Sequence, residues 1–245
     1  MKNEIKINID GNLVTECQSE KVLGVILNNE MSFKHHLYGD VENEGLIPQL
    51  SKRVGIIYKL SKQVSTDKLR CFIDGIFYSK INYCLSVYGN VFGLEAYKDK
   101  STKYMNFTKK DNNKLQVLQN RVNRILTKRN NRTSTQELLS LTNSLSVQQL
   151  IALRTLLMTY KILTMSKPSY LANKIRYAED QPMLRSSSES LQKINLKLNQ
   201  SRESFIYRAI TLYNKLDEHI RKCQSLNQFK VLARKWVKDN IPIKP

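Results

Sequence analysis

The acidic side chains that could hold catalytic metal ions are spread thinly along the sequence. Two-metal catalysis on phosphate groups needs clustered carboxylates, because hard cations must be held a few ångströms apart by oxygen ligands. No two aspartates are adjacent, and the nearest acidic groupings are Glu42 with Glu44, Glu179-Asp180 and Asp217-Glu218. We interpret these as solvated surface charges. The sequence therefore predicts no catalytic residue, no metal ligand and no cofactor on this chain.

The three histidines and four cysteines form no recognisable catalytic or metal-binding pattern. His35 and His36 would point about 100° apart on a helix, and His219 stands alone. No Glu-x-x-His or His-x-x-x-His spacing accompanies them, so we expect a partly exposed structural role. Cys84 paired with a histidine as nucleophile and base is an alternative that depends on the fold. The cysteines are too widely spaced for paired zinc ligands and are expected to be reduced: Cys17, Cys71, Cys84 and Cys223.

The chain is strongly basic, and its charge is unevenly distributed. Forty lysines and arginines against 21 aspartates and glutamates give its 245 residues a formal charge of +19. Residues 1–50 hold four basic and eight acidic side chains, so the remainder holds 36 basic and 13 acidic ones, an excess of +23. Such a field attracts polyanions. We expect the partner to be nucleic acid (RNA, an RNA–DNA hybrid or DNA), bound after residue 50.

Basic side chains recur on the outer faces of the predicted helices. Such cations neutralise backbone phosphates without specifying a base sequence. A solvated surface is the usual interpretation of any single charge run, but the large excess favours binding for the set as a whole. The predicted nucleic-acid-binding residues are Lys52, Arg53, Lys59, Lys114, Arg121, Arg124, Lys128, Arg129 and Arg208.

Hydrophobic composition limits the classes of protein to which the chain can belong. At 41% hydrophobic residues, the sequence can bury a core. No window approaches the ~20 consecutive apolar residues of a membrane-spanning helix, and Met1 is followed by polar residues rather than an apolar signal core. These features predict an intracellular protein without a membrane partner, and they do not distinguish nucleus from cytoplasm.

The first thirty residues have the alternation that is typical of β-strands. Ile5, Ile7 and Ile9 alternate with polar residues, and Asp10-Gly11 then offers a two-residue turn. A third short strand is expected at Lys21–Leu27. Gly24 lacks the companion residues of a phosphate-cradling loop, so we interpret it as a strand glycine that another backbone approaches.

From Met31 onward the sequence has helical spacing. Ser32 is expected to cap a helix that Pro48 interrupts, and residues 69–87 predict a buried helix. Residues 91–113 are polar and aperiodic, which predicts an exposed loop or insertion. The sequence as a whole predicts a mainly α fold, a helical bundle with a small N-terminal antiparallel β-hairpin or sheet and one or two minor strands near residues 183–198.

The later helices have clear sequence signatures. Leu115, Leu118, Val122 and Ile125 mark one side of a strongly amphipathic helix. A Ser three residues before a Glu or Gln satisfies free amides at a helix start. This signature occurs at Ser134–Glu137, Ser146–Gln149 and Ser225–Gln228.

Several strings in a fixed order resemble the region that follows the catalytic palm in LINE-type, non-LTR retrotransposon reverse transcriptases. The resemblance spans nearly the whole chain, and the order of the strings makes coincidence a poor explanation. The strings are Lys21–Leu27, Met31–Leu37, Asn82–Asn90, Leu118–Leu126, Tyr160–Leu163 with Pro168–Leu171, Ser204–Arg208, and Leu216–Arg221 with Ser225–Lys230.

The resemblance implies a division of the chain and a role for each part. Residues 1–30 would be the end of a palm-like β-hairpin, with Val22, Leu23 and Gly24 near the hairpin that grips the primer. Residues 31–90 would be thumb-like helices, residues 91–113 an insertion, and residues 114–245 a basic helical extension. The family's polymerising carboxylates and their divalent metal ions have no counterpart here, so a missing palm domain is a further expected partner. The sequence would then come from a truncated or decaying element copy, or from a gene model drawn from one.

Three hypotheses follow for the function. The first is a fragment of an RNA-directed DNA polymerase that grips a template–primer or structured RNA but is not an enzyme by itself. The second is a helical scaffold or partner-binding protein whose charge is merely solvated. The third is a nuclease or transferase, motivated only by scattered His, Cys and acidic residues.

Overall fold

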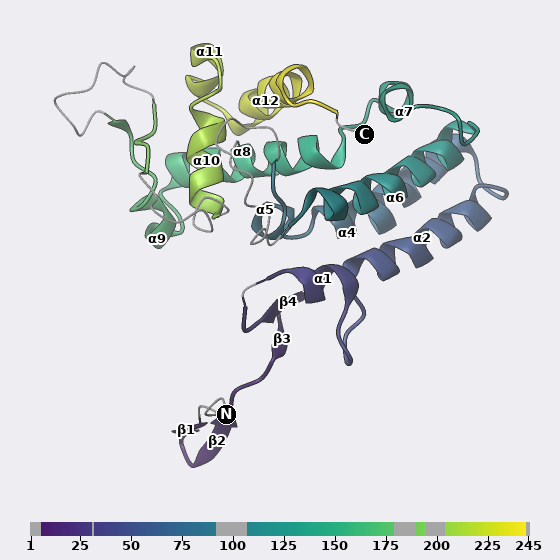
Figure 1. The fold of residues 1–245 in the computed structure, drawn as a ribbon. Coiled ribbons are helices and arrows are strands. Elements are labelled where there is room, and N and C mark those ends of the chain that lie inside the picture. Colours follow the sequence, from purple (N-terminus) through teal and green to yellow (C-terminus); the bar gives the residue numbers. More distant parts are fainter. Residues whose placement is uncertain (1–5, 31, 92–106, 179–189, 195–203, 244–245) are drawn as a thin grey trace.

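The chain begins with two short β-hairpins and continues as a series of helices (Figure 1). The computed structural model describes residues 6–30, 32–91, 107–178, 190–194 and 204–243. The strands are β1 (Lys6–Ile9), β2 (Asn12–Thr15), β3 (Ser19–Val22) and β4 (Val25–Asn28). The helices are α1 (Lys34–Tyr38), α2 (Leu46–Leu60), α3 (Thr66–Ile73), the π-helical η1 (Asp74–Tyr78), α4 (Ser79–Asn82), α5 (Leu85–Tyr88), α6 (Lys109–Thr127), α7 (Thr135–Thr142), α8 (Val147–Met165), α9 (Ser169–Ala172), α10 (Phe205–Tyr213), α11 (Glu218–Arg221) and α12 (Leu226–Asn240). The predicted class, mainly α with a small N-terminal antiparallel β part, is confirmed.

Both hairpins are antiparallel and turn on two residues with positive φ. Asp10 and Gly11 have φ values of 52° and 83°, and Leu23 and Gly24 have 48° and 80°. Two consecutive positive φ values are typical of the type I′ turn, whose twist suits a two-residue hairpin. The prediction of one strand at Lys21–Leu27 was wrong, because Leu23-Gly24 turns the chain and divides that range into two strands.

Two details at the start of the helical part also differ from the sequence prediction. Ser32 does not cap α1. The Ser32 amide instead donates to Asn28 Oδ1 over 2.7 Å, and Asn28 Nδ2 donates to the Ser32 hydroxyl over 2.9 Å. Pro48 does not interrupt a helix, because it lies in the first turn of α2, where no amide is needed for an intrahelical hydrogen bond.

The predicted loop at residues 91–113 was too long at its C-terminal end. Thr108 and Asp111 form a reciprocal capping box, with Thr108 N donating to Asp111 Oδ2 over 2.8 Å, and α6 therefore starts at Lys109. Phe107 and Val91, on either side of the remaining segment, are both buried. Residues 92–106 lie outside the described part of the chain.

The helix starts predicted from the three Ser capping signatures are confirmed at α7, α8 and α12. Ser146 and Gln149 form a complete capping box at α8. Ser134 accepts the Glu137 amide at α7, and Ser225 accepts the Gln228 amide at α12.

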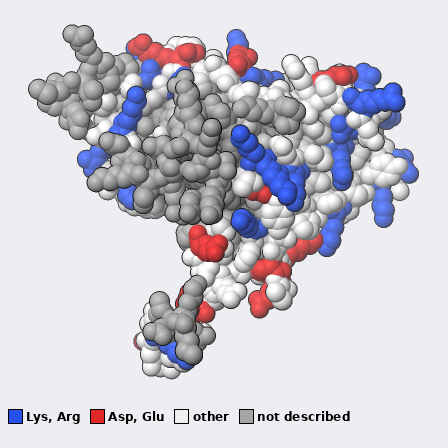
Figure 2. Space-filling view, viewed as in Figure 1, with Lys and Arg blue, Asp and Glu red and all other residues white. Residues whose placement is uncertain are grey.

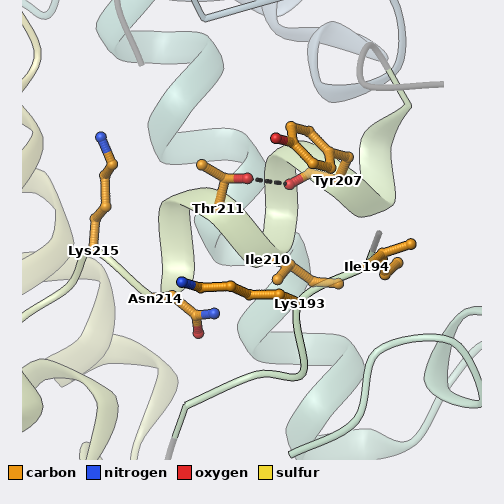
Figure 3. Close-up of a pocket in the computed structure, with 7 residues that line it drawn as sticks. All are labelled: Lys193, Ile194, Tyr207, Ile210, Thr211, Asn214 and Lys215. Carbon is orange, nitrogen blue, oxygen red and sulfur yellow. Dashed lines mark hydrogen bonds between the residues drawn. The ribbon is translucent and has the colours of Figure 1, made fainter. Parts of the chain in front are cut away.

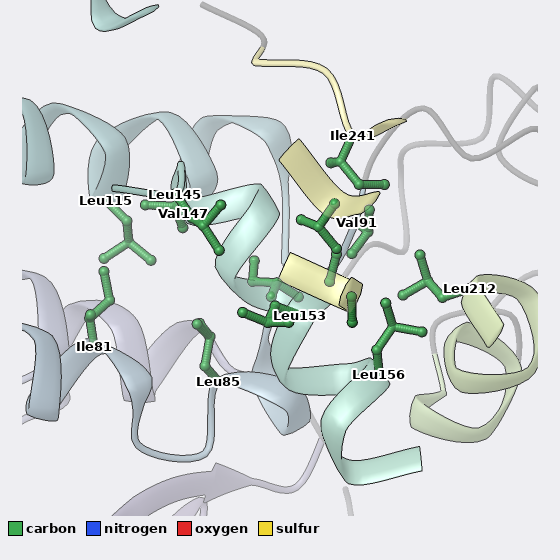
Figure 4. Packing of buried hydrophobic residues seen from close by; sticks show 14 of the residues in the cluster. Ile81, Leu85, Val91, Leu115, Leu145, Val147, Leu153, Leu156, Leu212 and Ile241 are labelled. Carbon is green, nitrogen blue, oxygen red and sulfur yellow. The ribbon is translucent and has the colours of Figure 1, made fainter. Parts of the chain in front are cut away.

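One continuous hydrophobic cluster extends from Leu37 in α1 to Ile241 after α12. Helix α8 lies at its centre and packs against α5, α10 and α12, while α6 packs against α2 and α7 (Figures 1 and 4). The cluster contains residues from both the 31–90 and the 114–245 segments, so these segments share a core. No helix in the described ranges is long and apolar enough to cross a membrane.

The minor strands predicted near 183–198 fall mostly on residues 179–189 and 195–203, which lie outside the described part. Within residues 190–194, Leu191 forms an isolated antiparallel bridge with Tyr177. The Asn214 side chain holds this segment by accepting from Leu191 N over 2.7 Å and donating to Leu191 O over 2.8 Å.

Candidate nucleic-acid interface

The orientation of α6 is fixed by buried amide side chains on one side of the helix. Gln116 Nε2 donates to Gln119 Oε1 and Asn120 Oδ1, each over 2.9 Å, and Gln116 Oε1 accepts from Val147 N over 2.9 Å. Gln119 Nε2 also donates to Leu145 O over 2.7 Å. Rotating α6 would leave these buried amides without hydrogen bonds, which is costly, so the network fixes the rotation of α6 against the start of α8. The other side of α6 then faces outward.

The outward side of α6 and the end of α2 form the two walls of an open groove. This α2–α6 groove encloses about 600 Å³. From α2 it is lined by Val54, Gly55, Tyr58 and Ser61, and from α6 and the loop that follows by Arg121, Arg124, Ile125, Lys128, Arg129 and Asn131. Every charged residue in this lining is basic. Figure 2 shows Lys and Arg gathered over this end of the molecule, whereas acidic side chains lie mainly over other parts of the face shown.

The four groove cations differ in burial and in the hydrogen bonds that they make within the protein. Arg124 is half-buried, and its Nη2 donates to Thr133 O over 3.2 Å. Arg121, Lys128 and Arg129 are exposed. Lys128 is the C-cap residue of α6, where a cation also interacts favourably with the negative end of the helix dipole. Lys128 can therefore stabilise the C-terminal end of α6 and also bind a ligand. Arg121 lies furthest from this helix end among the groove cations.

An aromatic side chain is part of the same groove. The Tyr58 side chain lies in the α2 wall and is 53% exposed. The Lys62 ammonium lies 4.8 Å from the centroid of its ring. Neither Tyr58 nor Lys62 was predicted from the sequence. The available signal was an aromatic residue followed four residues later by a lysine, at the end of a predicted helix.

Three further predicted cations lie outside the groove lining. Lys52 and Lys59, seven residues apart, share an exposed side of α2, and Lys52 Nζ lies 2.8 Å from Glu44 Oε1. Lys114 Nζ lies 4.3 Å from the centroid of the Tyr38 ring. Since Lys114 is seven residues before Arg121, it continues the same stripe of α6 about 10 Å further along the helix.

Two predicted binding residues have structural roles instead. Arg208 is only 3% exposed, and its Nη2 donates to Ser86 O over 2.7 Å, which ties α10 to α5. Arg208 is therefore not exposed to a ligand in this structure, because its guanidinium packs against the backbone of α5, which lies more than a hundred residues earlier in the chain. Arg53 is half-buried, and its Nη1 donates to Ile76 O in the π-helical turn, so it is only partly available to a ligand.

The hairpin turn at Val22, Leu23 and Gly24 lies against the helical part of the protein. The Tyr83 hydroxyl donates to Leu23 O over 2.5 Å, and the Tyr83 ring would lie 3.5 Å from a Cβ at Gly24. The Leu23 side chain is 85% exposed. Lys80 lies near this turn, where burial and the charges of Arg53 and Lys21 lower the pKa of its ammonium. Lys80 was not among the cations predicted from the sequence, because it stands outside any run of charges.

The histidines were expected to be partly exposed, and this was wrong for His36. Its ring is buried, its Nδ1 accepts from Ile26 N over 3.5 Å, and it lies 4.9 Å from the Tyr88 ring. Burial, assisted by the charge of Lys80, lowers the pKa of His36 to about 4. His36 is therefore a neutral packing residue at neutral pH. Across the described ranges, no three His, Cys, Asp or Glu side chains are grouped so that they could hold a metal ion.

Other hollows of the described surface also contain cations. One of about 320 Å³, the α8–α12 cleft, is lined by Arg154, Lys161 and Lys230 together with Asn82, Ser86, Leu157, Met158, Leu226 and Asn227. Another, about 400 Å³, lies against α10 (Figure 3). Two of its polar side chains are used within the fold, because Thr211 donates to Tyr207 O and Asn214 holds Leu191. Lys193 and Lys215 are the cations in its lining. Of these three hollows, the α2–α6 groove is lined by the most cations, and it is the candidate interface.

Comparison with known proteins identified no relative. No protein family, curated protein or solved structure matches the chain. The resemblance to non-LTR retrotransposon reverse transcriptases stays a prediction based on the order of the sequence strings.

Proposed function

We propose that the chain binds the sugar–phosphate backbone of a nucleic acid along the α2–α6 groove. The observation that carries this proposal is the lining of the groove, in which four cations occur without a carboxylate. Phosphate contacts of this kind position a strand and supply affinity that falls with salt, but they do not read the base sequence. The groove is therefore suited to hold many sequences.

The resemblance in sequence supports a more specific version of the proposal. In this version the strand is RNA, an RNA–DNA hybrid or DNA held for a non-LTR retrotransposon reverse transcriptase, and the polymerising carboxylates and their metal ions are supplied by a palm domain. The chain then contributes grip rather than catalysis. The turn at Leu23 and Gly24, which Tyr83 holds against the helices, would contact the primer.

A salt titration tests the proposal. Affinity for single-stranded RNA and for an RNA–DNA hybrid should fall steeply with salt, because each phosphate contact contributes about −0.7 to −0.9 to the slope of log K against log salt. The double variant Arg121→Gln, Lys128→Gln should make this slope shallower by about 1.4 to 1.8. Both residues line the groove.

A matched control separates the groove from the overall charge. The variant Lys174→Gln, Lys235→Gln removes the same charge from exposed positions outside the groove lining. Its slope should change much less than that of the groove variant. Equal effects of the two variants, or no binding at low salt, would contradict the proposal.

A second candidate, partner binding, is favoured by one observation on the first hairpin. Ile7, Ile9, Leu13 and Val14 on β1 and β2 are each about half exposed or more, and exposed apolar strands tend to pair with other chains. Light scattering of the full chain tests this candidate. A stable assembly that becomes monomeric in the variant Ile9→Lys, Leu13→Lys, without affinity for nucleic acid, would favour it.

A further inference from the structure

We propose that Tyr58 is a stacking platform for an unpaired base, so that the α2–α6 groove accepts a single-stranded segment of nucleic acid. This inference rests on the proposed function and names the form of nucleic acid that the groove holds. Side chains that bind single strands combine cations for the backbone with aromatic rings for the bases. The groove provides both kinds of side chain from opposite walls.

The exposure of Tyr58 is the first observation. Its side chain lines the groove and is 53% exposed, while Val54 beside it in the same wall is partly buried and packs against the core. Tyr58 therefore presents a large part of its ring surface to whatever occupies the groove. A base stacked on such a ring removes apolar surface of both partners from water.

The space around the ring is the second observation. Helical side chains lean toward the N-terminus, so Tyr58 leans over the turn that contains Gly55. A Cβ at Gly55 would meet no atom within 4 Å, so this place is open. The Lys62 ammonium lies 4.8 Å from the ring centroid, and Lys62 is itself exposed. The face of the ring beneath Lys62 is therefore reached from solvent, and a base that stacks there displaces only a flexible lysine side chain.

The charge of the facing wall is the third observation. Arg121 and Lys128 are exposed and lie across the groove from Tyr58. A strand whose phosphates contact these cations can turn a base toward the ring only if that base is unpaired, because bases in a duplex are stacked inside the helix. The groove is therefore better suited to a single strand than to an intact duplex.

The α8–α12 cleft provides an internal comparison. It is also lined by three cations, Arg154, Lys161 and Lys230, but none of its lining residues is aromatic. Such a cleft can attract phosphates but offers no platform for a base. The hollow against α10 has a tyrosine, Tyr207, but only two lysines, and Tyr207 is less exposed than Tyr58. The α2–α6 groove combines four cations with a ring that is more than half exposed.

The test compares strands with and without bases on the full chain. An oligouridine about ten nucleotides long, an oligothymidine of equal length and an abasic strand of equal charge are titrated at the same salt concentration. The wild-type chain should bind both base-bearing strands more tightly than the abasic strand. Tyr58→Ala should weaken base-bearing strands about 5- to 100-fold, leave the abasic strand nearly unchanged and so remove the difference. Tyr58→Phe should retain it.

Two controls keep the test specific. Tyr170→Ala removes an exposed tyrosine from α9, outside the groove lining, and should change no affinity. In the variant Tyr58→Trp, tryptophan fluorescence should be quenched by oligouridine and oligothymidine but not by the abasic strand, since the native Trp236 is buried and gives a constant background.

The outcomes distinguish this inference from the proposed function. Equal, salt-dependent binding of base-bearing and abasic strands would overturn stacking while leaving backbone binding intact. A loss in Tyr58→Ala that occurs with only one of the two base-bearing strands would also overturn it, because uracil and thymine both have a face that can stack. Absence of binding by every strand would overturn both.

Discussion

The two N-terminal hairpins have the same strand lengths and the same kind of turn, but their surroundings differ. All residues of β1 and β2 are exposed. In β4, by contrast, Val25 and Ile26 are buried, and the strand packs against α1. Figure 1 shows the first hairpin extending away from the helices and the second lying against them.

This difference shows that turn residues alone do not determine how firmly a hairpin is held. Isolated two-stranded hairpins are at best marginally stable in water. The second hairpin is held by residues distant in sequence, since His36 accepts from Ile26 N and Tyr83 donates to Leu23 O. The first hairpin has no comparable contact among the described residues, and an added partner would be needed to stabilise it.

The largest expected effect is the loss of stability when a buried residue of the second hairpin is truncated. Ile26 is 3% exposed, so Ile26→Ala should lower the unfolding free energy by about 2–4 kcal/mol, because a cavity remains in the packed core. Ile9→Ala on the first hairpin should cost less than about 0.5 kcal/mol. Urea unfolding of the two variants measures the difference. Similar costs would show that the first hairpin is packed as firmly as the second.

The next effect is a pH dependence of the unfolding free energy, caused by His36 of α1, whose ring contacts the second hairpin. Burial lowers the pKa of His36 to about 4 in the folded protein, against an ordinary value of 6.5. The stability contributed by the neutral ring is complete above pH 6.5 and is lost as the pH falls toward 4, because the unfolded chain binds the proton first. The loss should reach roughly 3 kcal/mol.

His36→Gln isolates this effect from the titration of the carboxylates. The variant should lose much less unfolding free energy than the wild-type chain between pH 6.5 and 4, as measured by urea unfolding at each pH. An unchanged pH dependence would mean that another group controls acid stability.

A smaller effect is expected at the contact between Tyr83 and the turn. Tyr83→Phe keeps the ring beside Gly24 but removes the hydroxyl that donates to Leu23 O. The loss should be about 1 kcal/mol, as for a typical hydrogen bond. Hydrogen exchange of the β3 and β4 amides measures it, and the β1 and β2 amides serve as the control. Equal acceleration in both hairpins would contradict a local role.

The smallest effect should be a gain in stability. Leu23 occupies a left-handed backbone conformation that costs most L-residues about 1 kcal/mol, and asparagine tolerates it better. Leu23→Asn should therefore raise the unfolding free energy by a few tenths of a kcal/mol to about 1 kcal/mol, because the Leu23 side chain is exposed and loses little packing. A decrease in thermal denaturation temperature would show that the Leu23 side chain contributes contacts.

Local chemistry made part of the fold predictable. Asp10-Gly11 favours the first turn, and Ser146 with Gln149 fixes the start of α8, because these signals act between residues at most three positions apart. The same limit explains the errors. Ser32 could cap a helix locally but pairs with Asn28 instead, and Pro48 could end a helix or occupy its first turn.

The candidate site was predictable only in part. The helical spacing of Arg121, Arg124 and Lys128 placed them on one side of α6, and the structure confirms that they lie together. Spacing could not show that Arg208 is buried on Ser86, because its environment is created by a helix more than a hundred residues earlier.

The sequence by itself determined the sign of the charge, the amphipathic helices and the turns, since each depends on composition or on neighbouring residues. Only the tertiary structure decided which residues of another helix face those cations. The α2–α6 groove exists because buried amides fix the rotation of α6 and because α2 packs beside it, and these contacts join residues far apart in the chain. For the same reason, the meeting of Tyr58 with Arg121 and Lys128 could not be seen in the sequence.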